Sequence, residues 1–332
     1  MMKFYKYQGA GNDFLIAHNR EGNITEKDGV LTAILEDGSV WTKAIADICD
    51  RRYGVGADGL MLLDAGTEPE SLIHGTESEA GASSEAESDY CPRRTDFHMT
   101  YYNSDGSGGM MCGNGGRCMV AFAHDCGVPG QLQEETADSD RQGWMVRYSF
   151  TAADGLHQAY IYEDSPEGKI IALGMKDVEE AFEYESLTGV SCPSAGYFLD
   201  TGTRHYVRFV DGLEEYDIIA YGRQIRYAAQ ELQPVGANVN FVEPSENLLR
   251  VRTYEKGVED ETYACGTGIV ASALAAYIKG IAPSTIFKTG RILYDIRARR
   301  DSLTVDFMPS EAGIAEDIYL TGPACKVCRI EI

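Results

Sequence analysis

The sequence predicts an α+β (α/β) fold of two similar halves, each a mixed β-sheet curled around one buried helix. Many extended segments alternate with few helices, and two of those helices are apolar on almost every side, which requires burial. These helices follow Cys112 and Cys265, and each cysteine precedes a helix-terminating glycine by the same 15 residues (127 − 112 and 280 − 265). Matching features that lie 265 − 112 = 153 residues apart indicate a duplicated half-chain, so the halves should be pseudo-symmetric.

Length and composition restrict the class of protein. The 332 residues have room for two domains with separate cores, and a hydrophobic content of 44% is typical of a globular protein. A net charge of −23 would repel nucleic-acid phosphates, so we expect no nucleic-acid partner. No signal peptide is evident, and no apolar run approaches the roughly 18 residues that span a bilayer. Nine cysteines without regular spacing argue against a secreted disulfide framework, so we expect a cytoplasmic protein with no membrane partner.

The first half opens with two strands, at 4–7 and ending at Ala17, that are joined by a glycine-rich turn. Residues 41–52 have helical spacing and lead into residues 54–59, Gly-Val-Gly-Ala-Asp-Gly, which match the pattern of a dinucleotide-binding loop. That pattern should follow a strand and open a helix, whereas this segment follows a helix and opens the strand 60–63. We therefore expect no nucleotide site here.

The segment 66–95 differs in composition from the rest of the chain, because it is rich in Glu, Ser, Ala and Gly. Such a segment cannot bury enough apolar surface to offset the entropy of ordering it. We expect a mobile, solvated acidic insertion between two strands, with an acidic lid as the alternative. The remaining expected elements are a hairpin of 144–152 with 155–161, strands at 169–173, 196–200, 206–210 and 249–254, a helix at 216–227, alternating strands within 292–308, and a last strand at 324–332.

The two cysteines stand where helices begin, beside free backbone N–H groups and the positive end of the helix dipole. This position favours a thiolate and also binds anions, so we expect the pKa of each thiol to be lowered. A metal site would need more ligands than Cys112, Cys118 and His124 supply. A cysteine nucleophile with His205 as its base would leave the second cysteine without a role.

A thiolate and a thiol on opposite sides of one carbon would use both cysteines. One would remove the α-proton of an amino acid while the other protonates the opposite face. The two helix ends would hold the α-carboxylate and its developing charge. Because no lysine motif for pyridoxal phosphate is evident, we expect no cofactor.

Five motifs resemble the diaminopimelate epimerase family, whose members interconvert LL- and meso-diaminopimelate without pyridoxal phosphate. They lie at residues 9–14 (GAGNDF), 51–59 (RRYGVGADG), 103–118 (with CGNGGRC), 237–242 (ANVNFV) and 254–268 (ending in CGTG). The resemblance implies two pseudo-symmetric halves with the site between them and a role in lysine and peptidoglycan precursor biosynthesis. It also implies that the last strand returns to the first half, so the halves would be 1–172 plus 322–332, and 173–321.

The resemblance also implies a role for particular residues. The catalytic acid/base pair would be Cys112 and Cys265, and the backbone N–H groups that hold the carboxylate would come from Gly113, Asn114, Gly266 and Thr267. The residues expected to orient the substrate are Asn12, Asn103, Asn238, Glu255, Lys256 and His205.

Three positions depart from the family pattern. Thr203 and Arg204 stand before His205 where the family has Asn-Pro, Lys256 stands where an arginine is usual, and Gly59 stands where some members have glutamine. Lysine keeps the positive charge but loses the bidentate fork that suits a carboxylate. The departures concern the distal end of the substrate, so two alternatives stay open: a racemase of another amino acid, or a catalytically silent amino-acid-binding protein. In each case the partner is a small molecule, and a homodimer is the oligomeric form to consider.

Overall fold

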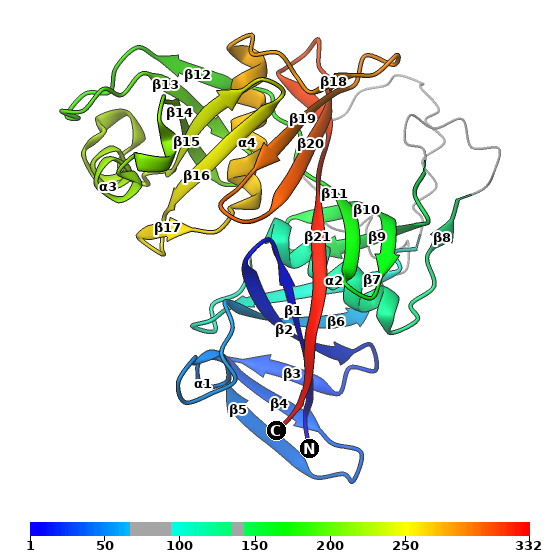
Figure 1. The fold of residues 1–332 in the computed structure, drawn as a ribbon. Helices are drawn as coiled ribbons and strands as arrows, with labels where there is room; N and C mark the ends of the chain where they lie inside the picture. Colours follow the sequence, from blue (N-terminus) through cyan, green and yellow to red (C-terminus); the bar gives the residue numbers. More distant parts are fainter. Residues whose placement is uncertain (67–93, 110, 134–142) are drawn as a thin grey trace, which may run out of the picture.

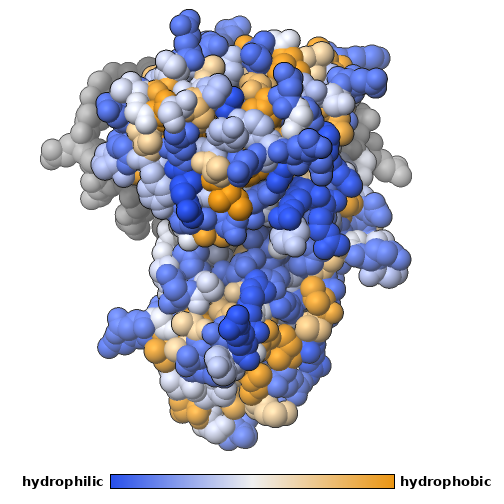
Figure 2. Space-filling view, turned by 60° about the vertical axis from the view of Figure 1, so that its left-hand side comes forward, coloured by the Kyte–Doolittle hydropathy of each residue, from blue (hydrophilic) through white to orange (hydrophobic). Residues whose placement is uncertain are grey.

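The computed structural model describes residues 1–66, 94–109, 111–133 and 143–332, and it has two lobes joined by the last strand. This strand, β21 (Ala315–Glu331), runs from the C-terminal half into the N-terminal half and is drawn in red in Figure 1. Both chain ends lie together at the far end of the N-terminal half, where the Met2 N–H donates to the Ile332 carbonyl at 2.8 Å. Figure 2 shows a narrowed waist between the two lobes.

The N-terminal half is a mixed sheet that closes around helix α2 (Gly113–Asp125). Neighbouring strands pair in sequence order, parallel at β2–β6 and β7–β9 and antiparallel at the other steps, and both β1 and β11 pair with β21. Helix α2 connects the parallel pair β7–β9 and its apolar residues form the core of this half. The strands are β1 (Lys3–Gly9), β2 (Asn12–Asn19), β6 (Gly59–Ala65), β7 (Phe97–Asn103), β9 (Val146–Ala152), β10 (Gly155–Ser165) and β11 (Gly168–Gly174).

The C-terminal half repeats this order of pairings around helix α4 (Gly266–Ile278). The parallel steps recur at β14–β15 and β16–β19, and α4 connects the second of them as α2 does in the first half. The strands are β12 (Ala181–Tyr184), β13 (Gly196–Asp200), β14 (Arg204–Phe209), β15 (Asn238–Ser245), β16 (Leu248–Glu255), β19 (Ile292–Arg297) and β20 (Ser302–Pro309), followed by β21. The predicted pair of pseudo-symmetric halves, each wrapped around a buried helix, is therefore confirmed.

The exact limits of the two halves stay a prediction. The proposed boundaries at 172/173 and 321/322 fall inside β11 and β21, and these two strands pair with each other from Lys169–Ala324 to Gly174–Tyr319. The sheet thus continues through the waist, and β21 is longer than the strand expected at 324–332 because it begins at Ala315.

Burial of α2 and α4 follows from their composition. Helix α4 is rich in alanine, which lets the strands approach its backbone closely, while Ile269, Val270 and Leu274 fill the spaces between them. Each large aliphatic side chain removed from water contributes roughly 1.5–3 kcal/mol. These cores hold the two helices, and therefore Cys112 and Cys265, in place.

The helix predicted over 41–52 is wrong in its first part. Residues Val40–Ala44 form strand β5, which pairs with β4 (Val30–Ile34) in a separate sheet with β3 (Ile24–Lys27). Helix α1 is only Ile45–Cys49. Trp41 and Ile45 repeat at helical spacing, but pairing of Trp41 with Ala33 gives the earlier residues an extended backbone.

The other connections are short or peripheral. Helix α3 (Ile218–Ala228) begins two residues after the predicted start, since Asp217 caps it by accepting from the Ala220 N–H. The remaining pieces are η2 (Leu213–Glu215), η3 (Gln230–Leu232), β8 (Gln131–Leu132), β17 (Asp260–Thr262) and β18 (Thr285–Ile286). No helix in the described ranges is long and apolar enough to cross a membrane.

The predicted insertion at 66–95 falls almost wholly outside the described residues. Its position between two paired strands is confirmed, because Ala65 of β6 faces Phe97 of β7. Its last residue, Thr95, is buried, so the expectation of a solvated segment does not hold at that end. The expected mobility of 67–93 concerns residues that the structure does not describe.

Candidate active site

The first turns of α2 and α4 meet between the two halves. Cys112 and Cys265 are the N-cap residues of these helices, and both have extended backbone angles. The Asn114 side-chain amide, in the first turn of α2, donates to the carbonyl of Ala264 at 3.0 Å. A Cβ atom on Gly266 would lie 3.5 Å from Asn114 Oδ1, so the two turns are in direct contact. The sequence-predicted pairing of the two helix starts is thus present.

The pKa of each of these thiols is raised, opposite to the sequence expectation. Burial is the largest cause for both, and the nearby Glu255 carboxylate acts in the same direction. Backbone N–H groups of Gly115 and Asn114 oppose it at Cys112, whose pKa still rises. At Cys265 burial raises the pKa to about 12 despite the Thr267 hydroxyl and the Gly268 N–H. Loss of water around the sulfur therefore outweighs the favourable helix end.

Three of the recognised motifs, 9–14, 51–59 and 103–118, meet at Asn12. Its Oδ1 accepts from Asn114 at 2.6 Å, and its amide donates to Asp58 at 3.0 Å. Arg51 donates to Asp13 through Nη1 and Nη2, and its Nη2 also donates to Asp58 at 2.6 Å. The segment 54–59, with its glycines, is therefore a turn that brings Asp58 to Asn12, and it lies between α1 and β6 as predicted.

Arg117 lies fully buried in α2, one turn after Cys112. Its Nη2 donates to Asn114 Oδ1 at 2.6 Å, and this bond directs the Asn114 amide nitrogen toward Asn12 and Ala264. Within the described part of the chain, neither Nε nor Nη1 has a hydrogen-bond partner. A buried positive charge thus stands behind the helix start that carries Cys112.

The C-terminal half contributes Glu255 and Asn238 from neighbouring strands. Asn238 Oδ1 accepts from the Lys256 backbone N–H at 2.8 Å, and Glu255 Oε2 accepts from Thr262 at 2.7 Å. Burial raises the pKa of Glu255, with the charge of Asp58 acting in the same direction. Lys256 itself is exposed at the end of β16.

His205 is buried on β14 and lies close to the start of α4. Its Nε2 is 2.9 Å from the Thr267 hydroxyl and 2.9 Å from the Thr203 hydroxyl, and Thr267 Oγ1 is 3.4 Å from Cys265 Sγ. Burial lowers the pKa of His205 to about 3, so its imidazole is neutral. From the sequence, His205 and Thr267 were expected near the site for unrelated reasons. In the structure, His205 contacts Thr267, which in turn contacts Cys265.

Asn103 forms side-chain hydrogen bonds with residues close to it in the sequence. Its amide donates to Ser107 Oγ at 2.9 Å, and its Oδ1 accepts from the Tyr101 hydroxyl at 3.1 Å. It faces Gly59 across β6 and β7, on the strand end that precedes the Cys112 loop. Gly113 is buried, and a Cβ atom at this position would lie 3.5–3.8 Å from the end of the Met175 side chain.

Sequence reasoning missed several residues around the cysteines. Asp58 and Arg51 lie in a motif that was recognised, but the motif itself does not say which side chain faces the site. Asn240 and Arg117 also lie in recognised motifs, and their hydrogen bonds depend on tertiary packing. Among the described residues, no three His, Cys, Asp or Glu side chains are grouped to hold a metal ion.

This fold occurs in solved structures of racemases, epimerases and related proteins. A probable proline racemase from Agrobacterium radiobacter K84 aligns with a TM-score of 0.61 and 12% identity, over 100% of this chain and 93% of that one. A phenazine biosynthesis protein of the PhzF family from Bacillus anthracis aligns with a TM-score of 0.60 and 12% identity, over 100% and 98%. At this identity the likeness concerns the fold alone.

Sequence similarity is more specific. The family model for diaminopimelate epimerase matches residues 4–141 and 197–304. The chain is 37% identical to the diaminopimelate epimerase of Flavobacterium psychrophilum, with 97% of both chains covered. It is 33% identical to that of Aquifex aeolicus, over 98% of this chain and 96% of the relative. The chain belongs to the diaminopimelate epimerase family.

Proposed function

We propose that the protein is an isomerase that interconverts LL- and meso-diaminopimelate by cofactor-independent proton transfer at the α-carbon. One observation carries the proposal: the starts of α2 and α4, each with a cysteine at its N-cap, are in contact. The hydrogen bond from the Asn114 side chain to the Ala264 carbonyl joins them. Two thiols on opposite sides of one carbon suit inversion, since a single base would return the proton to the face it left.

In this scheme, one group of residues near the cysteines binds the α-carboxylate and another orients the substrate. The backbone N–H groups of Gly113, Asn114, Gly266 and Thr267 bind the α-carboxylate and stabilise the charge that develops on it. Asn12, Asn103, Asn238 and Glu255 orient the substrate. The raised thiol pKa values make the thiolate a stronger base once it forms, which suits removal of a weakly acidic α-proton.

The test is incubation with LL-diaminopimelate in D₂O under reducing conditions. Epimerisation should incorporate deuterium at the inverted α-carbon, followed by NMR, and pyridoxal phosphate should be unnecessary. Cys112→Ala and Cys265→Ala should each abolish inversion and keep the native circular dichroism spectrum. Near-normal inversion in either variant would contradict the two-base scheme.

A racemase of another amino acid is the second candidate, because Lys256 is exposed and stands where the family usually has arginine. The variant Lys256→Met distinguishes a diaminopimelate epimerase from a racemase of another amino acid. If Lys256 binds the distal carboxylate, the KM for diaminopimelate should rise about ten- to a hundredfold, as expected for loss of a charged hydrogen bond. Lys256→Arg should preserve binding. Unchanged kinetics in Lys256→Met, together with turnover of proline or alanine, would favour the second candidate.

A further inference from the structure

A chain of hydrogen bonds in the C-terminal half leads from the protein interior to Cys265. The Thr253 hydroxyl donates to Asn240 Oδ1 at 2.9 Å, and Asn240 Nδ2 lies 3.0 Å from His205 Nδ1. His205 Nε2 lies 2.9 Å from the Thr267 hydroxyl, which lies 3.4 Å from Cys265 Sγ. The chain crosses β16, β15 and β14 and ends on α4.

The inner part of this chain is dry and tightly packed. Asn240 and His205 are fully buried, and Thr253 is 2% exposed. A Cβ atom on Gly268 would lie 2.4 Å from Asn240 Oδ1 and 3.1 Å from His205 Cε1, so α4 packs directly on both side chains. Water has no room to replace a missing partner there, so each hydrogen bond depends on its neighbours.

The direction of each hydrogen bond follows from the chemistry of the groups. An amide nitrogen only donates, so His205 Nδ1 accepts from Asn240. A neutral imidazole carries one proton, which must then be on Nε2, and Nε2–H donates to the hydroxyl oxygens of Thr267 and Thr203. The Thr267 hydrogen is thereby directed away from His205 and can point to Cys265 Sγ.

We propose that Asn240 is a positioning residue that holds His205 in the Nε2–H tautomer, so that the Thr267 hydroxyl donates to the Cys265 sulfur when it is a thiolate. This role rests on the proposed function of Cys265. It makes His205 a neutral donor and excludes it as the base that deprotonates Cys265. It also provides one fixed dipole that opposes the effect of burial on this thiol.

The first test is the tautomer itself. In protein labelled with ¹⁵N at histidine, the His205 signals, assigned with His205→Gln, should show a protonated Nε2 and an unprotonated Nδ1 at pH 7. A protonated Nδ1 would overturn the proposal. This measurement needs neither substrate nor turnover, so it stands even if the proposed reaction is wrong.

The second test measures the thiolate of Cys265 by its rate of alkylation with iodoacetamide, followed by peptide mass spectrometry between pH 7 and 10. Asn240→Leu and Thr267→Val should each slow alkylation of Cys265 about tenfold at a fixed pH, as expected for loss of one hydrogen bond to an anion. The double variant should be no slower than Thr267→Val, because Asn240 acts through Thr267. The other titrating groups near this sulfur, Glu255 and Cys112, are unchanged in all variants.

Thr203→Val is the matched control. Thr203 lies as close to His205 Nε2 as Thr267 does, and it competes for the Thr267 hydrogen at 2.9 Å. Its removal should leave alkylation of Cys265 unchanged or faster. Additive losses in the double variant, or a slowing in Thr203→Val equal to that in Thr267→Val, would contradict the proposal. If Asn240→Leu does not fold, Thr253→Val tests the same link, because it frees the Asn240 amide to rotate.

Discussion

Burial opposes ionisation of both active-site thiols, and this sets the expected pH dependence. In the proposed scheme the free enzyme is productive with one thiolate and one thiol, and both pKa values lie above the ordinary value of about 8.5. Below the lower of the two pKa values, kcat/KM for diaminopimelate should rise about tenfold per pH unit, and it should fall once the second thiol ionises. A pH–rate profile measures this. A plateau beginning near pH 6 would mean that a thiol is already ionised there.

Arg117 is expected to favour activity at the expense of stability. Its charge is fully buried and bonds only through Nη2 among the described residues, an arrangement that a hydrophobic side chain often replaces without loss of stability. In Arg117→Met, the free energy of unfolding should change by no more than about 1 kcal/mol, because removal of the charge offsets the unpaired Asn114 oxygen. The kcat should fall at least about tenfold, since Asn114 loses its fixed orientation.

Arg291 provides the matched control for Arg117. It is also buried, but it is paired with Asp306 at 2.7 Å and with Asp317. Arg291→Met removes the charged pairing of Arg291 with the buried Asp306 and should cost about 3–5 kcal/mol, with kcat of the folded protein unchanged. Urea unfolding and steady-state kinetics separate the two cases. A large loss of stability in Arg117→Met with normal kcat would make Arg117 a purely structural residue.

The sequence predicted the local structure at both cysteines. Cys112 and Cys265 stand at helix starts as expected, whereas the hydrogen bond between Asn12 and Asn114 was not predicted. The direction of the thiol pKa shift was wrong, because a helix terminus can be read from sequence but the exclusion of water by packing cannot. Asn240 and Arg117 were missed for the same reason.

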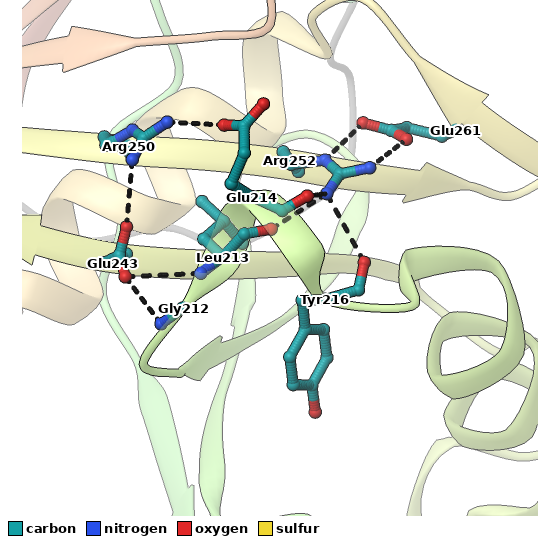
Figure 3. A network of polar contacts seen from close by, with 8 residues as sticks. All are labelled: Gly212, Leu213, Glu214, Tyr216, Glu243, Arg250, Arg252 and Glu261. Atoms are coloured by element: carbon teal, nitrogen blue, oxygen red, sulfur yellow. Dashed lines mark hydrogen bonds and ion pairs between the residues drawn. The ribbon is translucent and has the colours of Figure 1, made fainter.

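At the scale of elements, Arg252 connects the segment before α3 to the sheet through hydrogen bonds. Figure 3 shows Arg252 of β16 donating to the carbonyls of Leu213, Glu214 and Tyr216 while pairing with Glu261 at 2.6 Å. Its neighbour Arg250 on the same strand pairs with Glu214 and Glu243. Arg252 therefore joins three elements, η2, β16 and β17, ahead of the Cys265 loop.

The two arginines should differ in their contribution to stability. Arg252→Leu should cost about 2–4 kcal/mol, because it leaves three carbonyls and a buried carboxylate without their donor. Arg250→Leu should cost less than about 1 kcal/mol, since its side chain is 40% exposed and its pairs are screened by water. Urea denaturation of both variants measures the difference. Equal losses would show that the carbonyl contacts contribute little.

Elements were predictable where hydrophobic periodicity was strong. The strands around both cysteines and the helices α2, α3 and α4 were expected within a few residues. The helix at 41–52 failed because its first four residues pair with β4, and the pairing partner of a short segment is a tertiary property. The start of β21 at Ala315 was missed because residues 315–320 follow no clear alternation of polar and apolar residues.

At the scale of the whole molecule, the duplication was visible in the spacing of the two cysteine motifs, and the return of the last strand followed only from the family resemblance. The structure adds how the halves are joined. Residues 319–324 of β21 pair with β11, and residues 325–331 pair with β1, so one strand completes the N-terminal sheet on both sides. Ile330 and Ile332 also pack on the apolar residues beneath β3–β5.

Truncation after Ala324 should therefore open the N-terminal half selectively. It removes the β1 pairing from Gln8–Cys325 to Lys3–Glu331 and the contact between Met2 and Ile332, while the pairing of β21 with β11 and β20 is retained. The lost hydrogen bonds and apolar burial should lower the free energy of unfolding by several kcal/mol, at about 1 kcal/mol per backbone hydrogen bond. In hydrogen exchange, β1, β2 and β6 should lose protection while β15, β16 and β19 keep it. Activity should disappear, because the Asn12–Asn114 contact depends on β1 and β2.

The control for the truncation is Val327→Thr, at a position that is 55% exposed, and this variant should behave as the parent protein. Equal loss of protection in both halves would show that they unfold as one cooperative unit, with β21 transmitting the loss across the waist.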